Sequence, residues 1–294
     1  MKNHLLAIPK KTMTQKTPSS PFTIAPDGHS LIGEVWQADS AKGDVILLHG
    51  GGQTRHAWKG TGQALAGQGW NATTYDARGH GESDWRLDEV YNLDGHLADL
   101  TAILALGNSP PVLVGASMGG MTSLLMAGEH PGSVRGLVLV DIALRVDTVE
   151  SDKVGAFMAD YRDGFATLDE AAAAVQAYNP ARTRPPSAEG LRRNLMKRAD
   201  DRWYWRWDPA VLNSRADMGR WTERLKAAAR HIKVPVMLVR GMDSLMIDQE
   251  IRDEFMDHIP HASVVDVTGA GHMVAGDDNS AFMDAVKLFL QNQT

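Results

Sequence analysis

Short apolar runs alternate with stretches of helical spacing along most of this 294-residue chain. Almost continuously apolar runs, typical of strands buried on both faces, occupy residues 44–49, 111–116, 136–141 and 234–241. Residues 30–37 alternate apolar and polar positions, as a half-buried strand does. Amphipathic helical patterns lie at residues 58–70, 92–106 and 118–130. Because strands that alternate with helices build parallel sheets, the pattern predicts an α/β fold with a mostly parallel, helix-flanked β-sheet.

The alternation of strands and helices is interrupted between about residues 144 and 231. No convincing strand is visible there, and helical patterns take its place, including one that begins with the capping-box pair Thr167 and Glu170. Four aromatic residues lie within residues 203–207, and they either pack this insertion onto the main domain or line a cavity. The predicted parts are a flexible N-terminal tail at 1–20, a core domain at 21–143 and 232–294, and a helical cap at 144–231.

The stretch from Gly115 to Gly119 has the sequence GASMG and lies between a predicted strand and a predicted helix. A G-x-S-x-G pattern in this setting is typical of a nucleophile elbow, in which the glycines permit a sharp turn that exposes the serine. At the N-terminus of a helix, Ser117 also lies where negative charge developing on a substrate is stabilised. Ser117 is therefore the candidate nucleophile.

A serine hydroxyl is a poor nucleophile unless a base removes its proton. His272 lies in the glycine-rich stretch GAGHMV, after a predicted final strand at 262–267, and we expect it to be that base. His49 ends a predicted strand, and His80 lies in the turn-rich stretch DARGHGESD. We expect these two histidines to shape the backbone rather than to transfer protons.

Four motifs in this chain, taken together and in order, resemble those of the α/β-hydrolase superfamily, in particular its cap-containing esterases, haloperoxidase-like proteins and C–C hydrolases. The motifs are LLHGGGQTRHAW, YDARGHGESDW, GASMGG and GAGHMV. The resemblance covers about residues 22–290 and implies a Ser-His-Asp triad that forms an acyl-enzyme. It also implies that the backbone N–H groups of Gly51 and Met118 form the oxyanion hole. The residues at 53–55 either touch substrate or lie in a solvated loop.

The carboxylate that orients His272 has two candidates. The resemblance places it after the strand that follows the cap, three residues beyond a glycine, but counting from Gly241 that position holds Ser244. Asp243 lies one residue earlier, and such a shift at a strand end tends to aim the side chain at the opposite face. A minority of relatives carry the acid at the end of the strand before the cap, where this chain has Asp141. We expect Asp141 to be the acid, with Asp243 as the alternative and Ser244 as a supporting hydrogen-bond donor.

Composition excludes several classes of function. The formal charge of −6 and the lack of a dense Lys/Arg cluster oppose a nucleic-acid surface, and the lack of cysteine excludes thiolate nucleophiles and cysteine-ligated metals. No G-x-G-x-x-G follows a strand, and there is no P-loop and no H-E-x-x-H, so we expect neither cofactor nor metal. The apolar run at residues 5–8 is too short for a signal peptide or a membrane span. We therefore expect a cytoplasmic protein without a membrane partner, whose oligomeric state the sequence does not predict.

These residues favour a serine hydrolase that acts on a small carbonyl compound such as an ester or a lactone. Two alternatives use the same fold: cofactor-free lyase or perhydrolase chemistry with the same triad, and a catalytically silent binding protein. Relatives with an aspartate nucleophile are disfavoured because Ser117 holds that position. The natural substrate is not predicted, because selectivity comes from the shape of the cap and the pocket.

Overall fold

The computed structural model describes residues 17–85, 91–145, 148–178, 186–268, 271 and 280–293. Among these residues an eight-stranded sheet has the order β1-β2-β4-β3-β5-β6-β9-β10. The pairings β1–β2 and β2–β4 are antiparallel, and all the others are parallel. The strands are β1 (Ser20–Ile24), β2 (Leu31–Trp36), β3 (Asp44–Leu48), β4 (Asn71–Tyr75), β5 (Val112–Ala116), β6 (Gly136–Val140), β9 (Val236–Gly241) and β10 (Ser263–Val267). The predicted α/β fold with a mostly parallel sheet is confirmed.

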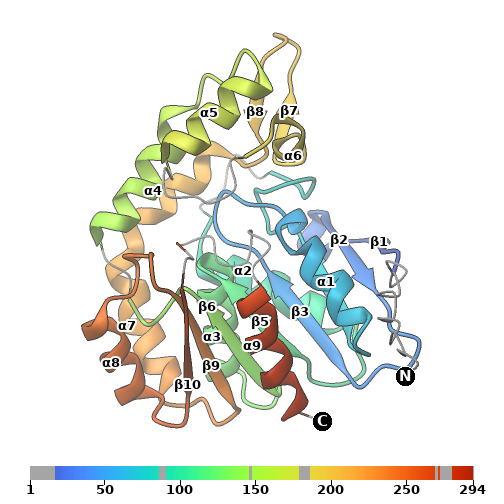
Figure 1. Cartoon of the computed structure of the whole chain (residues 1–294), viewed down its shortest axis with the longest axis vertical. Coiled ribbons are helices and arrows are strands. Elements are labelled where there is room, and N and C mark those ends of the chain that lie inside the picture. The colour runs from blue at the N-terminus through green and yellow to red at the C-terminus, as the bar shows by residue number, and fades with distance from the viewer. Residues whose placement is uncertain are drawn as a thin grey trace, which may run out of the picture.

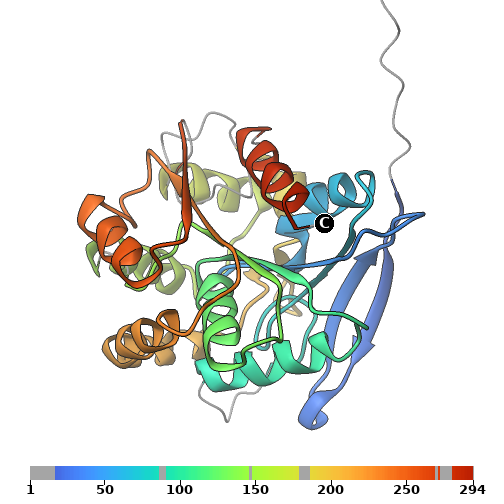
Figure 2. The ribbon, with the colours of Figure 1, turned by 90° about the horizontal axis from the view of Figure 1, so that it is seen from below.

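Helices cover both faces of the sheet (Figures 1 and 2). One face packs against α1 (Lys59–Ala66) and α9 (Ser280–Gln291). The other packs against α2 (Leu93–Leu104), α3 (Met118–Glu129), α7 (Met218–Ala229) and α8 (Gln249–His258). In β5, for example, Val112 and Val114 join the first layer and Leu113 joins the second, and all three are fully buried. This burial on both sides explains why the central strands have continuous apolar sequences.

Two strands of the sheet, β1 and β4, are absent from the sequence prediction. The sequence of β4 is NATTY, which shows no apolar run. Its buried Thr74 is accommodated because the hydroxyl donates to the Leu47 carbonyl of the neighbouring strand, at 3.0 Å. A polar side chain paired in this way costs little to bury, but its partner cannot be read from local sequence. Of the predicted N-terminal tail, residues 1–16 lie outside the described residues, and Ser20 already belongs to β1.

The part of the chain between β6 and α7 lies above the sheet in Figure 1 and has its own small core. Its elements are α4 (Thr148–Asp160), α5 (Leu168–Tyr178), α6 (Ala188–Leu191), β7 (Leu195–Lys197), β8 (Trp203–Trp205) and η3 (Pro209–Asp217), followed by α7. As the capping-box pattern predicts, the Thr167 hydroxyl accepts from the Glu170 amide, at 3.1 Å. The expectation that no strand occurs here was wrong, because β7 and β8 pair as an antiparallel hairpin. Three-residue strands are too short to show an alternating pattern in sequence.

The aromatic residues at 203–207 pack within the insertion itself, and two of them line a cavity, which is one of the two alternatives from the sequence. Trp205 and Trp207 are buried with Phe165 in the core of the insertion, and the same two tryptophans line a cavity beneath it. The last helix of the predicted cap, α7, packs instead on α3 of the core. A Cβ added at Gly128 would lie 2.3 Å from the Ala228 carbonyl oxygen, which shows how closely these two helices approach.

Candidate active site

Ser117 occupies a sharp turn between β5 and α3, with no other residue between the two elements. Its backbone has φ 48° and ψ −116°, a conformation that is strained for a residue with a side chain. The flanking glycines are required sterically: a Cβ at Gly115 would lie 2.4 Å from the Gly119 carbonyl oxygen, and one at Gly119 would lie 2.6 Å from Leu48 Cβ. The turn has the strand–turn–helix setting of a nucleophile elbow. Within the described part of the chain, the Ser117 hydroxyl makes no hydrogen bond.

The glycine-rich loop after β3 lies next to this elbow. A Cβ added at Gly50 would lie 3.2 Å from Ser117 Cβ. The loop is closed by a bond from the Gln53 amide to the Gly50 carbonyl, at 3.1 Å, and by one from the Gly50 amide to Gln53 Oε1, at 3.0 Å. We use the name oxyanion loop for residues 50–52, after the role that the sequence predicts for Gly51. The N–H groups of Gly51 and Met118 donate to no group among the described residues, and Met118 opens α3, where helical amides lack intrahelical partners.

Two buried histidines bond the backbone around the oxyanion loop. His49 Nδ1 lies 2.9 Å from the Gly50 carbonyl oxygen, and its Nε2 lies 3.0 Å from the Ala77 amide. His80 Nε2 lies 3.1 Å from the Gly52 amide, and its Nδ1 lies 3.0 Å from the carbonyl oxygen of Arg78. Burial lowers the pKa of His49 to about 4 and that of His80 to about 3. Both side chains bond backbone groups as the sequence predicts, and both are neutral at physiological pH.

The two candidate acids have very different surroundings. Asp141 directly follows β6 and is fully buried, whereas Asp243 is exposed. Asp141 accepts hydrogen bonds from the Ser244 hydroxyl, at 2.5 Å, and from the Gly241 amide, at 3.3 Å. Because β5 and β6 pair with Ala116 opposite Val140, Asp141 leaves the sheet beside Ser117. The structure thus brings Asp141 and Ser244 together at the strand ends near the elbow, and it places the Asp243 side chain in solvent.

His272 lies outside the described residues. The strand before it in sequence, β10, ends at Val267, which is paired with Gly241 of β9. The chain therefore leaves the sheet beside the Gly241 amide that donates to Asp141. This is the same edge at which Ser117 and the oxyanion loop lie.

A cavity of about 770 Å³ lies between the sheet edge and the insertion, and Ser117, Gly51 and Met118 all line it. Most of the other described lining residues are apolar. Among the described residues that line the cavity there is no carboxylate, and the cationic side chains are Arg145 and Arg193. Arg145 is paired with Glu250 and Glu254, at 2.5 and 2.7 Å. The wall is thus mostly apolar with Arg193 as a further cation, and it favours a partly apolar ligand.

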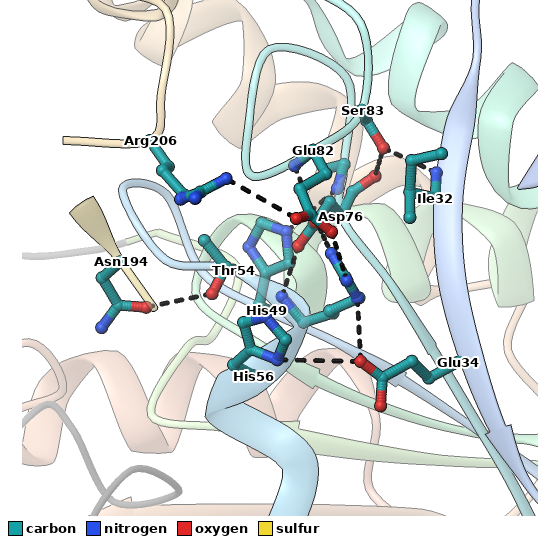
Figure 3. A network of polar contacts seen from close by, with 12 residues as sticks. Ile32, Glu34, His49, Thr54, His56, Asp76, Glu82, Ser83, Asn194 and Arg206 are labelled. Atoms are coloured by element: carbon teal, nitrogen blue, oxygen red, sulfur yellow. Dashed lines mark hydrogen bonds and ion pairs between the residues drawn. The ribbon is translucent and has the colours of Figure 1, made fainter. Parts of the chain in front are cut away.

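For residues 53–55 the sequence leaves substrate contact and a solvated loop as alternatives. In the structure Gln53 lines the cavity, whereas Thr54 and Arg55 form structural contacts. Arg55 is buried and forms ion pairs with Asp76, Glu82 and Glu34. Figure 3 shows these three acidic residues. Burial alone would lower the pKa of Arg55, but the Asp76 and Glu82 carboxylates raise it. Thr54 donates to Asn194 Oδ1 of the insertion, at 3.0 Å. The acidic partners of Arg55 lie in β2 and after β4, so no local sequence signal identifies this network.

The described part of the chain shows neither a metal site nor a membrane-spanning helix. Within those residues, no group of three or more His, Asp or Glu side chains is arranged to hold a metal ion. No described helix is both long enough and apolar enough to cross a membrane.

Comparisons with known proteins agree with this geometry. The family model described as the alpha/beta hydrolase fold matches residues 44–278. The esterase Rv0045c of Mycobacterium tuberculosis is 30% identical over 251 residues, which are 83% of this chain and 81% of that protein. The sn-1-specific diacylglycerol lipase ABHD11 of Mus musculus is 29% identical over 264 residues, 84% of this chain and 80% of the relative.

Among solved structures, E-2-(acetamidomethylene)succinate hydrolase matches with a TM-score of 0.80 and 20% identity, over 93% of this chain and 100% of that one. A structure of the M. tuberculosis esterase Rv0045c matches with a TM-score of 0.74 and 25% identity, over 93% of this chain and 92% of the other.

Proposed function

This chain belongs to the α/β-hydrolase family, and on that premise we propose that it is a serine hydrolase acting on small carboxylic esters. The observation that carries the proposal is Ser117, held at φ 48° between β5 and α3 and lining the 770 Å³ cavity. The names of the relatives support ester cleavage, since one is an esterase and another a lipase.

In the proposed reaction the Ser117 hydroxyl attacks the ester carbonyl and its proton passes to His272. The carbonyl oxygen becomes an oxyanion, which accepts hydrogen bonds from the Gly51 and Met118 amides. Each donor of this kind contributes about 3 kcal/mol to transition-state stabilisation. Both amides lack another partner within the described residues, so no existing bond has to break when the oxyanion forms.

Asp141 is the proposed acid of the triad. Its carboxylate holds the His272 imidazole in one tautomer and stabilises the imidazolium formed during attack. The Ser244 hydroxyl and the Gly241 amide bond the Asp141 carboxylate and fix its orientation. Two donors from the same chain segment compensate for burying this charge.

Collapse of the first tetrahedral intermediate breaks the ester C–O bond, and His272 returns the proton to the departing alcohol. Water, activated by His272, then attacks the acyl-enzyme and releases the carboxylic acid. The segment 148–217 acts as a cap, whose apolar lining binds the acyl and alcohol groups while excluding bulk water.

The proposal is tested by Ser117→Ala with a panel of nitrophenyl esters from acetate to decanoate. We expect kcat/KM to fall by at least about 10⁴-fold and labelling by a fluorophosphonate to disappear. Ser123→Ala is the matched control, because Ser123 lies in α3, the helix that Ser117 precedes, and its buried hydroxyl donates to the Gly119 carbonyl at 2.7 Å. Unchanged turnover in Ser117→Ala would refute the proposal. Product analysis with water or peroxide as the acyl acceptor separates hydrolysis from perhydrolysis.

A further inference from the structure

The backbone planes on either side of Gly51 are held by two different histidines. The Gly50 carbonyl and the Gly51 amide belong to one peptide group, so His49, which bonds that carbonyl, orients the Gly51 N–H. The next peptide group contains the Gly52 amide, which donates to His80 Nε2. Gly52 has φ 75°, a conformation that glycine adopts at no steric cost. Three consecutive glycines have little intrinsic preference for one conformation. The two histidines, together with the Gln53 amide that also donates to the Gly50 carbonyl, therefore determine which way the Gly51 amide points.

The protonation state of His80 follows from its partners. The Gly52 amide can only donate, so His80 Nε2 accepts and carries no proton. The Arg78 carbonyl can only accept, so His80 Nδ1 carries the proton. The same reasoning gives His49 the same tautomer, because its Nε2 faces the Ala77 amide and its Nδ1 faces the Gly50 carbonyl. The two rings lie against each other, with centroids 5.2 Å apart, and each one links the loop after β3 to the loop after β4.

The backbone around His80 is itself fixed by the cap. The Gly81 amide donates to the Arg206 carbonyl at 2.6 Å, and the Asp208 amide donates to the Gly79 carbonyl at 2.7 Å. His80 and Trp207 form an isolated antiparallel bridge. The imidazole of His80 therefore extends from a segment that is anchored on both sides, with no exposed surface.

We propose that His80 is a positioning residue for the oxyanion hole: its Nε2 accepts from the Gly52 amide and thereby keeps the neighbouring Gly51 N–H directed into the cavity. This inference rests on the proposed function, because it assigns the Gly51 amide to the oxyanion. His80 itself touches neither substrate nor Ser117 in this role. Without its bond, the Gly51–Gly52 peptide group is free to rotate, and the Gly51 N–H is then held only from the Gly50 side, where His49 and the Gln53 amide bond the Gly50 carbonyl.

Two variants separate this role from a general structural one, because each keeps one of the two bonds. In His80→Gln the side-chain oxygen reaches the former Nε2 position and accepts from Gly52, but the donor to Arg78 is lost. In His80→Asn the amide donates to Arg78, but nothing reaches Gly52. Each variant leaves one buried backbone group unpaired, so we expect comparable decreases in melting temperature. The comparison of their activities is thus not confounded by stability.

We expect His80→Asn to lower kcat by about 10- to 100-fold with little change in KM, because the oxyanion contact forms mainly in the transition state. His80→Gln should retain kcat within about 3-fold, which is rescue by the variant that keeps the acceptor. Equal losses in both variants, a larger loss in His80→Gln, or wild-type activity in His80→Asn would overturn the inference. Failure of the proposed function has a different signature, since the unmodified protein would then show no ester hydrolysis and no fluorophosphonate labelling.

A measurement on the unmodified protein keeps the inference testable if a variant fails to fold. Nitrogen NMR of the histidine rings should find at least two of the eleven in the neutral Nδ1–H tautomer at pH 7, with Nε2 accepting a hydrogen bond. Fewer than two rings in that state would overturn it.

Discussion

Exchange of Asp141 for asparagine is the sharpest test of the proposed triad, because the variant keeps the volume of the side chain and removes its charge. Asp141 is fully buried and accepts bonds from the Ser244 hydroxyl and the Gly241 amide. Asparagine has one carbonyl oxygen in place of two carboxylate oxygens. One of the two donors therefore faces the NH2 group of the amide and loses its acceptor. Losing one charge-assisted hydrogen bond costs about 2 kcal/mol of folding stability.

The effect on turnover should be much larger than the effect on stability. An amide at this position does not stabilise the imidazolium and favours the wrong tautomer of the base, which costs about 10⁴-fold in kcat, or about 5 kcal/mol of transition-state stabilisation. The assay is the steady-state hydrolysis of a short nitrophenyl ester, with urea unfolding of the same samples to confirm that the Asp141→Asn protein is folded.

Asp243→Asn is the matched control, because it makes the same chemical change two positions from Gly241 in an exposed side chain. We expect its kcat to stay within about 2-fold of the unmodified protein. A loss in Asp243→Asn that exceeds the loss in Asp141→Asn would refute the assignment of the acid. It would also show that burial and hydrogen bonding at Asp141 serve folding alone.

Two further predictions concern stability. Burial lowers the pKa of His49 to about 4 and the pKa values of His80 and His96 to about 3. The free energy of unfolding should fall as the pH is lowered from 7 towards 4. Below about pH 6.5 these histidines bind protons in the unfolded chain but stay neutral in the folded protein, and each contributes up to about 1.4 kcal/mol per pH unit. In denaturant titrations at several pH values, the free energy of unfolding of His96→Gln should depend less steeply on pH than that of the unmodified protein. Gly119→Ala should destabilise the fold by about 2 kcal/mol or more, since its Cβ would lie 2.6 Å from Leu48 Cβ, whereas Gly60→Ala in α1 meets open space and should be neutral or gain up to about 1 kcal/mol in the same assay.

The sheet and the elbow could be predicted because their signals are local. A central parallel strand is buried on both faces, so its sequence is a continuous apolar run, as in 111–116. The elbow at Ser117 requires small residues at fixed offsets, and the close contacts of Gly115 and Gly119 explain those offsets. The meeting of Asp141 with Ser244 could be anticipated too, since each follows a parallel strand and such strands end at the same edge of a sheet.

Other features could not be predicted because the contacts that stabilise them join distant parts of the chain. The bond from Thr54 to Asn194 links residues 140 positions apart, and that from Arg55 to Asp76 links residues 21 apart. Nothing in the sequence around Arg55 distinguishes a buried, ion-paired arginine from a solvated one. Strand β4 was missed for the same reason, because the hydroxyl of its buried Thr74 is paired across to β3.

The oxyanion loop shows why such distant contacts gather near this site. The loop turns through Gly52 at φ 75°, a conformation that glycine adopts easily. The same conformational freedom means that glycines do not hold an N–H donor in one orientation. A donor without a fixed orientation contributes little to transition-state stabilisation. Rigidity must then come from side chains outside the loop. Neutral histidine suits that task in a buried position, because it offers one donor and one acceptor without the cost of burying a charge.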